Sequence, residues 1–80
     1  MAKLELFGTV RCPHTQDMRD WLEFRRCEFV EHDVEVDAEA RRRMREIANG
    51  QRNVPLLVED GRVVQVGWQG RSCILDADQP

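Results

Sequence analysis

Residues 11–15 read Arg-Cys-Pro-His-Thr and form the part of this sequence best suited to chemistry. A short apolar run and the turn Gly8-Thr9-Val10 precede them, and a segment with helical periodicity follows. We therefore expect Cys12 where a strand ends and a helix begins. Pro13 fits the first turn of a helix, because its fixed φ suits that position and its missing N–H has no helical partner to lose.

A cysteine at this junction is expected to be reactive. It faces unpaired backbone N–H groups and the positive end of the helix dipole, both of which favour the thiolate. The thiolate is the nucleophilic form of cysteine. A protonated His14 would add positive charge beside Cys12. The alternative is a buried, inert cysteine that packs as a small hydrophobic residue.

The composition bounds the kind of protein. Its 80 residues, 41% hydrophobic and 34% charged, predict one domain over residues 1–80. A net charge of −3 excludes a general attraction to nucleic acid or to an anionic membrane. We expect neither a signal peptide nor a membrane-spanning helix, because no apolar run is long enough for either. The three cysteines are odd in number and widely spaced, which favours a cytoplasmic protein over a secreted disulfide framework.

Apolar periodicity predicts alternating strands and helices, followed by a hairpin. Asp37 is a good N-cap for the second helix, and Asn49-Gly50 is a typical stop. Asp60-Gly61 is typical of a two-residue hairpin. The first two strands should be parallel through a right-handed crossover. The tail leaves room for about two turns of helix. The expected elements are strands at 3–7 and 28–34, helices at 13–25 and 38–48, and hairpin strands at 56–59 and 62–66.

Two features have a functional and a structural interpretation. Trp21 and Phe24 could form a binding pair, but core packing is the commoner role of aromatic residues in an amphipathic helix. His32 has no second His or Cys nearby at metal-ligand spacing. We favour a solvated or locally hydrogen-bonded histidine, and we expect no metal site.

The arginine run at 41–43, with Arg45, could suggest nucleic-acid binding. However, Glu39 with Arg43 and Arg42 with Glu46 are spaced as ion pairs along a helix, and no aromatic residues interleave the arginines. We therefore predict a charged helix surface that faces solvent.

Three separated motifs together resemble the glutaredoxins, which are small redox proteins with the thioredoxin fold. Cys12-Pro13-His14-Thr15 resembles the active-site tetrad in its one-cysteine form. Asn53-Val54-Pro55 resembles the family's Thr-Val-Pro segment, in which the proline is cis and lies opposite the catalytic cysteine. Val66-Gly67-Trp68 stands where the family has its Gly-Gly turn. The resemblance implies an α/β fold with a four-stranded mixed sheet, the order β-α-β-α-β-β, and a short or absent final helix.

Within the glutaredoxins, the run at 66–71 looks most similar to the short Uxx-star group, whose members often carry selenocysteine at the position of Cys12. The sequence also departs from the family pattern. Thr9 stands where many glutaredoxins have a lysine, so Arg11 or Arg52 would have to supply that charge. Thr15 replaces a resolving cysteine at the fourth position of the tetrad.

The resemblance implies a glutathione-dependent thiol–disulfide oxidoreductase. In a monothiol mechanism, Cys12 attacks the glutathionyl sulfur of a mixed disulfide, and a second glutathione then regenerates Cys12. Glutathione is therefore the expected co-substrate, and the hydroxyl of Thr15 could donate a hydrogen bond to the thiolate. The residues expected to hold glutathione or a peptide are Arg11, Gln51, Arg52, the backbone of Val54 beside Pro55, Gly67 and Trp68.

Cys73 leaves two readings open. The family topology would return the chain toward the active site after Trp68, so Cys73 could be a resolving thiol for Cys12. Alternatively, Cys73 could pack at the base of the sheet beside Ile74 and Leu75. Cys27 is expected to be structural, because it lies at the far end of the first helix, roughly 20 Å from Cys12.

Two other functions belong to different classes. One is a dedicated electron donor to a partner reductase, which would dock through Trp68 and Gln69. The other is an iron–sulfur module held between two subunits by Cys12 and glutathione, but Pro13 and His14 depart from the Cys-Gly-Phe-Ser tetrad usual for that kind. The expected partners are glutathione, protein disulfides and a specific reductase or acceptor enzyme, with no nucleic acid and no membrane. We expect a monomer.

Overall fold

The computed structural model describes residues 3–50 and 52–74 of the chain. The predicted strands and helices agree with the observed ones to within one residue at each end. The elements are β1 (Leu4–Gly8), α1 (Pro13–Phe24), β2 (Phe29–Asp33), α2 (Ala38–Ile47), β3 (Asn53–Val54), β4 (Leu56–Glu59), β5 (Arg62–Val66) and β6 (Cys73–Ile74).

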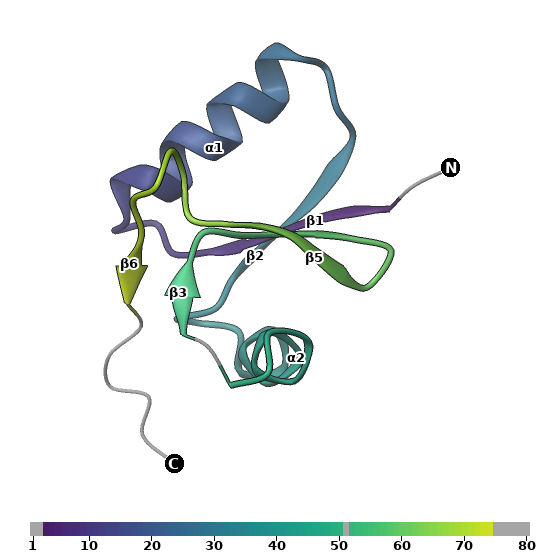
Figure 1. The fold of residues 1–80 in the computed structure, drawn as a ribbon, viewed down its shortest axis with the longest axis vertical. Helices are drawn as coiled ribbons and strands as arrows, with labels where there is room; N and C mark the ends of the chain where they lie inside the picture. The colour runs from purple at the N-terminus through teal and green to yellow at the C-terminus, as the bar shows by residue number, and fades with distance from the viewer. Residues whose placement is uncertain (1–2, 51, 75–80) are drawn as a thin grey trace.

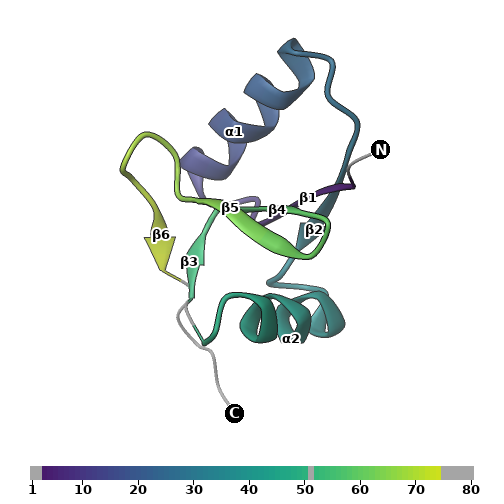
Figure 2. The same ribbon diagram turned by 45° about the vertical axis from the view of Figure 1, so that its right-hand side comes forward.

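A four-stranded mixed sheet in the order β2-β1-β4-β5 forms the centre of the molecule. β1 is parallel to β2 and antiparallel to β4, and β4 is antiparallel to β5. The helices lie on opposite sides of this sheet, with α1 above it and α2 below it in Figure 1 and Figure 2. This arrangement confirms the predicted α/β fold. No helix among the described residues is long and apolar enough to cross a membrane.

Two hydrophobic clusters hold the helices to the sheet. Leu6 and Phe7 are neighbours on β1 and point to opposite faces, so each belongs to a different cluster. The cluster on the α1 side is formed by the buried residues Leu6, Met18, Leu22 and Leu57. The cluster on the α2 side is formed by Phe7, Cys12, Val34, Ala40, Met44, Val54, Leu56 and Val58.

The hairpin between β4 and β5 and the start of α2 are as predicted. Asp60 and Gly61 have φ values of +52° and +83°, and positive φ at both turn positions is the signature of a tight β-hairpin. The side chain of Asp37 accepts a hydrogen bond from the backbone N–H of Ala40 at 3.1 Å. The Asp37 carboxylate therefore caps the first turn of α2.

The sequence predicts a short or absent final helix, and the described part of the tail forms the strand β6, which pairs with β3 in a separate two-stranded sheet. The chain reverses at residues 68–71, where Trp68 and Arg71 exchange backbone hydrogen bonds of 2.7 and 2.9 Å. Gln69 and Gly70 have φ values of +53° and +80° in this turn. The reversal returns the chain to β3 as an extended segment, and both views show β6 beside β3 (Figure 1, Figure 2). Residues 75–80, including Leu75, lie outside the described part.

The expected core packing of Trp21 and Phe24 is wrong. Phe24 is 85% exposed and Trp21 is 39% exposed, because α1 faces the sheet through Met18 and Leu22. Phe24 is turned well away from that stripe on a helix of 3.6 residues per turn. Trp21 lies at the edge of the stripe and contacts Trp68, with ring centroids 5.7 Å apart.

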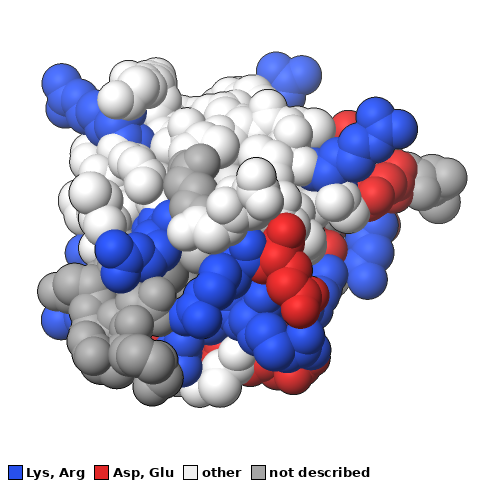
Figure 3. Space-filling view, turned by 60° about the horizontal axis from the view of Figure 1, so that its bottom comes forward, with Lys and Arg blue, Asp and Glu red and all other residues white. Residues whose placement is uncertain are grey.

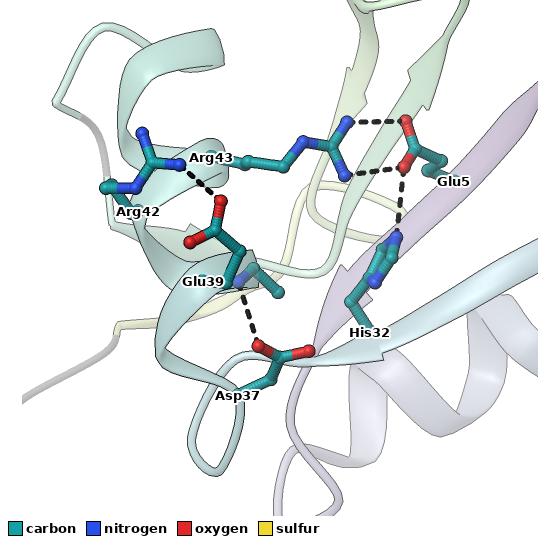
Figure 4. A network of polar contacts seen from close by, with 7 residues as sticks. Glu5, His32, Asp37, Glu39, Arg42 and Arg43 are labelled. Carbon is teal, nitrogen blue, oxygen red and sulfur yellow. Dashed lines mark hydrogen bonds and ion pairs between the residues drawn. The ribbon is translucent and has the colours of Figure 1, made fainter.

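Glu5 on β1 connects three elements, although it is only 3% exposed. The two terminal nitrogens of Arg43 on α2 donate to its carboxylate at 2.9 and 3.1 Å, and Nε2 of His32 on β2 lies 3.0 Å from Oε2 (Figure 4). The Phe7 ring stacks on the His32 ring with centroids 4.7 Å apart, and the Arg43 guanidinium lies 5.6 Å from the centroid of the Phe7 ring. We expected His32 to be solvated or to bond a nearby residue, but its partner Glu5 is 27 residues away in the sequence.

The arginine surface of α2 is only partly as predicted. Arg42 bonds Glu46 at 3.0 Å as expected and also pairs with Glu39. The expected pair of Glu39 with Arg43 is wrong, because Arg43 reaches the buried Glu5 instead. Arginine and acidic side chains lie beside each other on the side of the molecule that carries α2 (Figure 3). This mixture of charges agrees with a solvated helix face.

The network lowers the pKa of Glu5 from 4.5 to about 2, chiefly through the hydrogen bonds from Arg43. A carboxyl group with a lowered pKa stabilises the folded state fully above its unfolded value. We therefore expect this contribution, about 3 kcal/mol, to be complete above about pH 4.5 and to disappear as the pH falls toward 2.

The Glu5→Gln variant should lose this stabilisation at pH 7, by about 3 kcal/mol, because a neutral amide leaves Arg43 without its charged partner. Urea denaturation at pH 7 and at pH 3 measures the loss and its pH dependence. Glu46→Gln is the matched control, since Glu46 forms an exposed pair, and its stability should change little. Equal losses in the two variants would contradict a special role for the buried network.

Candidate active site

Cys12 occupies the N-cap of α1, as the sequence predicts. Its φ of −91° and ψ of 115° are extended, and Pro13 follows as the first helical residue. The carbonyl oxygen of Cys12 accepts hydrogen bonds from the N–H groups of Thr15 and Gln16 at 3.1 and 3.3 Å. The side chain makes no capping hydrogen bond to the helix. The Cys12 residue is 2% exposed.

Cys12 and Cys73 form a disulfide across a sequence separation of 61 residues. Their Cα atoms lie 6.1 Å apart, within the roughly 4.4–6.8 Å usual for disulfides. Cys73 reaches this position because it lies in β6, directly opposite Val54 of β3. Of the two readings of Cys73, this geometry therefore favours pairing with Cys12 over simple packing at the base of the sheet.

The predicted cis peptide bond between Val54 and Pro55 is confirmed. Both residues are buried, and the carbonyl oxygen of Val54 lies 4.0 Å from Sγ of Cys12. The carbonyl oxygen of Pro55 accepts a hydrogen bond from the N–H of Gly67 at 2.7 Å. The cis peptide bond therefore joins a residue close to the disulfide to one that contacts the turn leading to β6.

Thr15 lies one helical turn after Cys12 and is fully buried. Its hydroxyl oxygen has no hydrogen-bond partner among the described residues. A Cβ on Gly8 would lie 2.6 Å from this oxygen, so only glycine allows β1 and α1 to approach so closely. A buried hydroxyl without a partner is unusual, and it marks a place where a further acceptor is expected.

A pocket of about 220 Å³ opens beside the disulfide. Arg11 and Glu35 form an ion pair at its wall, and the Arg11 guanidinium lowers the pKa of Glu35. The pair brings one positive and one negative group to the pocket, where the sequence predicts only the arginine. The pocket is lined by Thr9, Arg11, Cys12, Glu35, Val54, Cys73 and Ile74.

The other predicted site residues are distributed around this pocket or away from it. His14 is half-buried in the first turn of α1, and Arg52 is exposed just before β3. Gly67 is buried with a φ of +79°, whereas Trp68 packs against the α1-side cluster and does not line the pocket. Gln51 lies outside the described residues.

Sequence reasoning missed Glu35 and the pair of Asn53 with Ser72. Nδ2 of Asn53 donates to Oγ of Ser72 at 2.9 Å, which joins β3 to the residue before Cys73. Neither pair has a local signal, since the partners are 24 and 19 residues apart. The pair of Asn53 with Ser72 could have been predicted only if the run Ser72-Cys73-Ile74 had been recognised as a strand.

The Glutaredoxin family model matches residues 4–64 of the chain. Two crystal structures of the thioredoxin-like protein BC3987 are similar to it. A threonine-to-alanine mutant is 32% identical, with a TM-score of 0.74 and 86% of each chain covered. The unmutated protein is 30% identical, with a TM-score of 0.72, and covers 82% of this chain and 88% of its own.

A crystal structure of glutaredoxin 1 from Francisella tularensis complexed with cacodylate shares the fold. It is 18% identical, with a TM-score of 0.62 and 85% of each chain covered. A search of curated protein sequences gave no match. These matches confirm the thioredoxin-like fold inferred from the sequence. Membership of the Uxx-star group stays a prediction.

Reduction of the Cys12–Cys73 disulfide should lower the free energy of unfolding by about 4 kcal/mol, because the bond closes a long loop in the unfolded chain. Urea denaturation with and without a thiol reductant measures this difference. Cys27→Ser should show the same drop, since Cys27 is a free thiol outside the disulfide. Cys73→Ser should show no drop, and a drop in that variant would mean that the stabilising bond lies elsewhere.

Proposed function

Because the chain belongs to the glutaredoxin family, we propose that it is a thiol–disulfide oxidoreductase with Cys12 as the attacking thiol and Cys73 as the resolving thiol. The observation that carries this proposal is the disulfide between these two residues. Thr15 occupies the position where a resolving cysteine would follow Cys12 in the tetrad. A second thiol from β6 can replace that cysteine in the cycle.

The proposed cycle has two exchange steps. Cys12 thiolate attacks one sulfur of a substrate disulfide, forms a mixed disulfide and releases the first substrate thiolate. Cys73 thiolate then attacks Sγ of Cys12, which releases the second substrate thiolate and leaves the Cys12–Cys73 bond. The substrate disulfide gains two electrons, and the two protein thiols lose them.

Glutathione is the reductant that we propose for the return to the dithiol, as it is used by the glutaredoxin family. One glutathione thiolate attacks Cys12 and releases Cys73 thiolate, and a second removes the first as glutathione disulfide. Without Cys73, the same two glutathione molecules support the monothiol cycle. The pocket beside Cys12 offers Arg11 and Glu35, which suit the carboxylate and ammonium groups of glutathione.

Three features favour a stable Cys12 thiolate in the reduced protein. The sulfur belongs to the N-cap of α1, where the helix dipole attracts a negative charge. The Thr15 hydroxyl needs an acceptor, and a thiolate one turn earlier would provide it. His14 stands in the same turn and adds positive charge when protonated. A low pKa helps most when Cys12 is the leaving group.

We propose protein disulfides and glutathione mixed disulfides as substrates and the monomer as the working unit, because one chain supplies every residue of the site. A cycle that returns through a thiol reductant needs a reducing compartment, which favours the cytoplasm. The free thiol of Cys27 agrees with that setting.

Cysteine variants test the assignment of the two thiols. Cys12→Ser should lower the turnover of a peptide disulfide by about 100-fold or more, because the nucleophile is lost. Cys73→Ser should slow reduction of a peptide disulfide but keep activity on glutathione mixed disulfides, which need one thiol. Cys27→Ser is the matched control and should stay within about twofold of the wild type. Turnover by Cys12→Ser would refute the proposed function.

Intact-mass measurement after mild oxidation with glutathione disulfide distinguishes the two cycles. The wild-type protein should lose the mass of two hydrogens and carry a Cys12–Cys73 link after peptide mapping. Cys73→Ser should instead gain one glutathione on Cys12. A wild-type protein that retains one glutathione on Cys12 would favour the monothiol cycle and leave Cys73 without a resolving role.

A further inference from the structure

The two residues of β6 pair with the edge of β3. Asn53 pairs with Ile74 and Val54 pairs with Cys73 in an antiparallel register. The Asn53 side chain holds Ser72, and the sulfur of Cys73 is bonded to Cys12. An extended segment whose cysteine is bonded to the attacking cysteine has the geometry of a mixed disulfide with a bound peptide.

We propose that the segment Ser72–Ile74 occupies the binding site of a substrate peptide and leaves β3 when the disulfide is reduced. Asn53 then selects substrates with a hydroxyl residue immediately before the reacting cysteine. The inference rests on the proposed function and names the substrate class, an extended cysteine-containing polypeptide. Such a segment binds along β3 in the register of β6, with its cysteine opposite Val54.

Few contacts other than the disulfide hold β6 in place. The strand pairs through only two residues among those described, Ile74 is 67% exposed, and the one apolar contact of β6 with a core cluster is that of the partly buried Cys73. A pair of strands this short has no independent stability in water. Reduction removes the one covalent link between β6 and α1. The strand is therefore among the first parts of the fold to open once the bond is broken.

The turn before β6 is anchored more firmly than the strand itself. The N–H of Gly67 donates to the Pro55 carbonyl oxygen, and a Cβ on Gly67 would lie 2.6 Å from the Arg71 carbonyl oxygen. The Trp68–Arg71 backbone bonds close the turn, and Trp68 packs on the α1-side cluster. The mobile segment is thus expected to begin at Ser72, which keeps Cys73 near Cys12 after release.

An empty β3 edge has hydrogen-bonding groups that need a partner. Backbone N–H and C=O groups at a strand edge readily pair with another extended chain. The amide of Asn53 loses its acceptor when Ser72 leaves. A substrate residue with a hydroxyl at the same register position restores that bond, whereas alanine there leaves the amide unpaired. One such hydrogen bond corresponds to a preference of about threefold to tenfold.

Two peptides test this preference directly. The probes are the symmetric disulfide dimers of Gly-Arg-Ser-Cys-Ile and Gly-Arg-Ala-Cys-Ile, reacted with the reduced Cys73→Ser protein. Mass spectrometry of quenched samples follows the single-turnover formation of the Cys12–peptide disulfide. We expect the serine peptide to react about threefold to tenfold faster than the alanine peptide. A third peptide with alanine in place of isoleucine is the control, and its rate should match that of the serine peptide.

The Asn53→Ala variant should abolish the difference between the serine and alanine peptides while it still reacts with both. Equal rates for the two peptides on the protein that retains Asn53 would overturn the inference and leave the proposed function intact. No reaction at Cys12 with any peptide would instead refute the proposed function. If Asn53→Ala fails to fold, the ratio of rates on the Asn53 protein still decides the question.

Strand release has its own measurement, by NMR. Cross-strand NOEs between residues 53–54 and residues 73–74 should be present in the oxidised wild-type protein and absent in the reduced Cys73→Ser protein. Forming the Cys12 disulfide with the serine peptide should give new NOEs between residues 53–54 and the peptide. Persistence of the intramolecular NOEs after reduction would overturn the release of β6.

Discussion

The close approach of Gly8 to Thr15 is the contact on which the active site depends. β1 lies in the middle of the sheet, and α1 must begin directly beyond its end for Cys12 to reach the level of β3. A side chain at residue 8 would collide with the Thr15 side chain and push the first turn of α1 outward. Because that turn carries Cys12, its displacement would also move the sulfur away from Val54 and Cys73.

The contacts that stabilise the main sheet are largely separate from the strand that carries Cys73. The hydrophobic clusters and the Glu5–Arg43 pair hold α1 and α2 to the sheet, and β6 adds to them only the partly buried side chain of Cys73, which packs against the α2-side cluster. β6 lies outside the four-stranded sheet, pairs with β3 and is linked to the N-cap of α1 by the disulfide. Reduction of the disulfide therefore removes the constraint that the bond places on the unfolded chain, whereas the strand pairing of the main sheet does not depend on β6.

The sequence predicted those parts of the molecule that have local signals. Asp60-Gly61 defines a hairpin, Asp37 caps α2, and Cys12-Pro13 marks the junction of β1 and α1, each through the preferences of a few adjacent residues. The fold order follows from these elements and from the handedness of the crossover. The cis bond before Pro55 was predicted only through the resemblance to glutaredoxins.

Most of the missed features join residues that are distant in the sequence. Arg43 was expected to pair with Glu39 on its own helix, but the buried Glu5 offers a drier site where an ion pair is stronger. β6 has too few residues to show a period, and its pairing depends on the turn at residues 68–71. Phe24 has an apolar side chain typical of the core, but it lies on the part of α1 that faces away from the sheet. Periodicity describes one element at a time and contains no information about such pairs.

The separation of the two thiols has a consequence that a resolving cysteine within α1 would not have. A thiol at position 15 would react from inside a helix that does not move, and the edge of β3 would stay open in both redox states. Cys73 instead carries β6 with it, so its approach to Cys12 and the closure of the β3 edge are one event. In the proposed cycle, the oxidised protein excludes a substrate strand from β3, and reduction exposes that edge together with the thiol of Cys12. The Cys12–Cys73 bond then controls both the access of a substrate strand to β3 and the presence of a free thiol on Cys12.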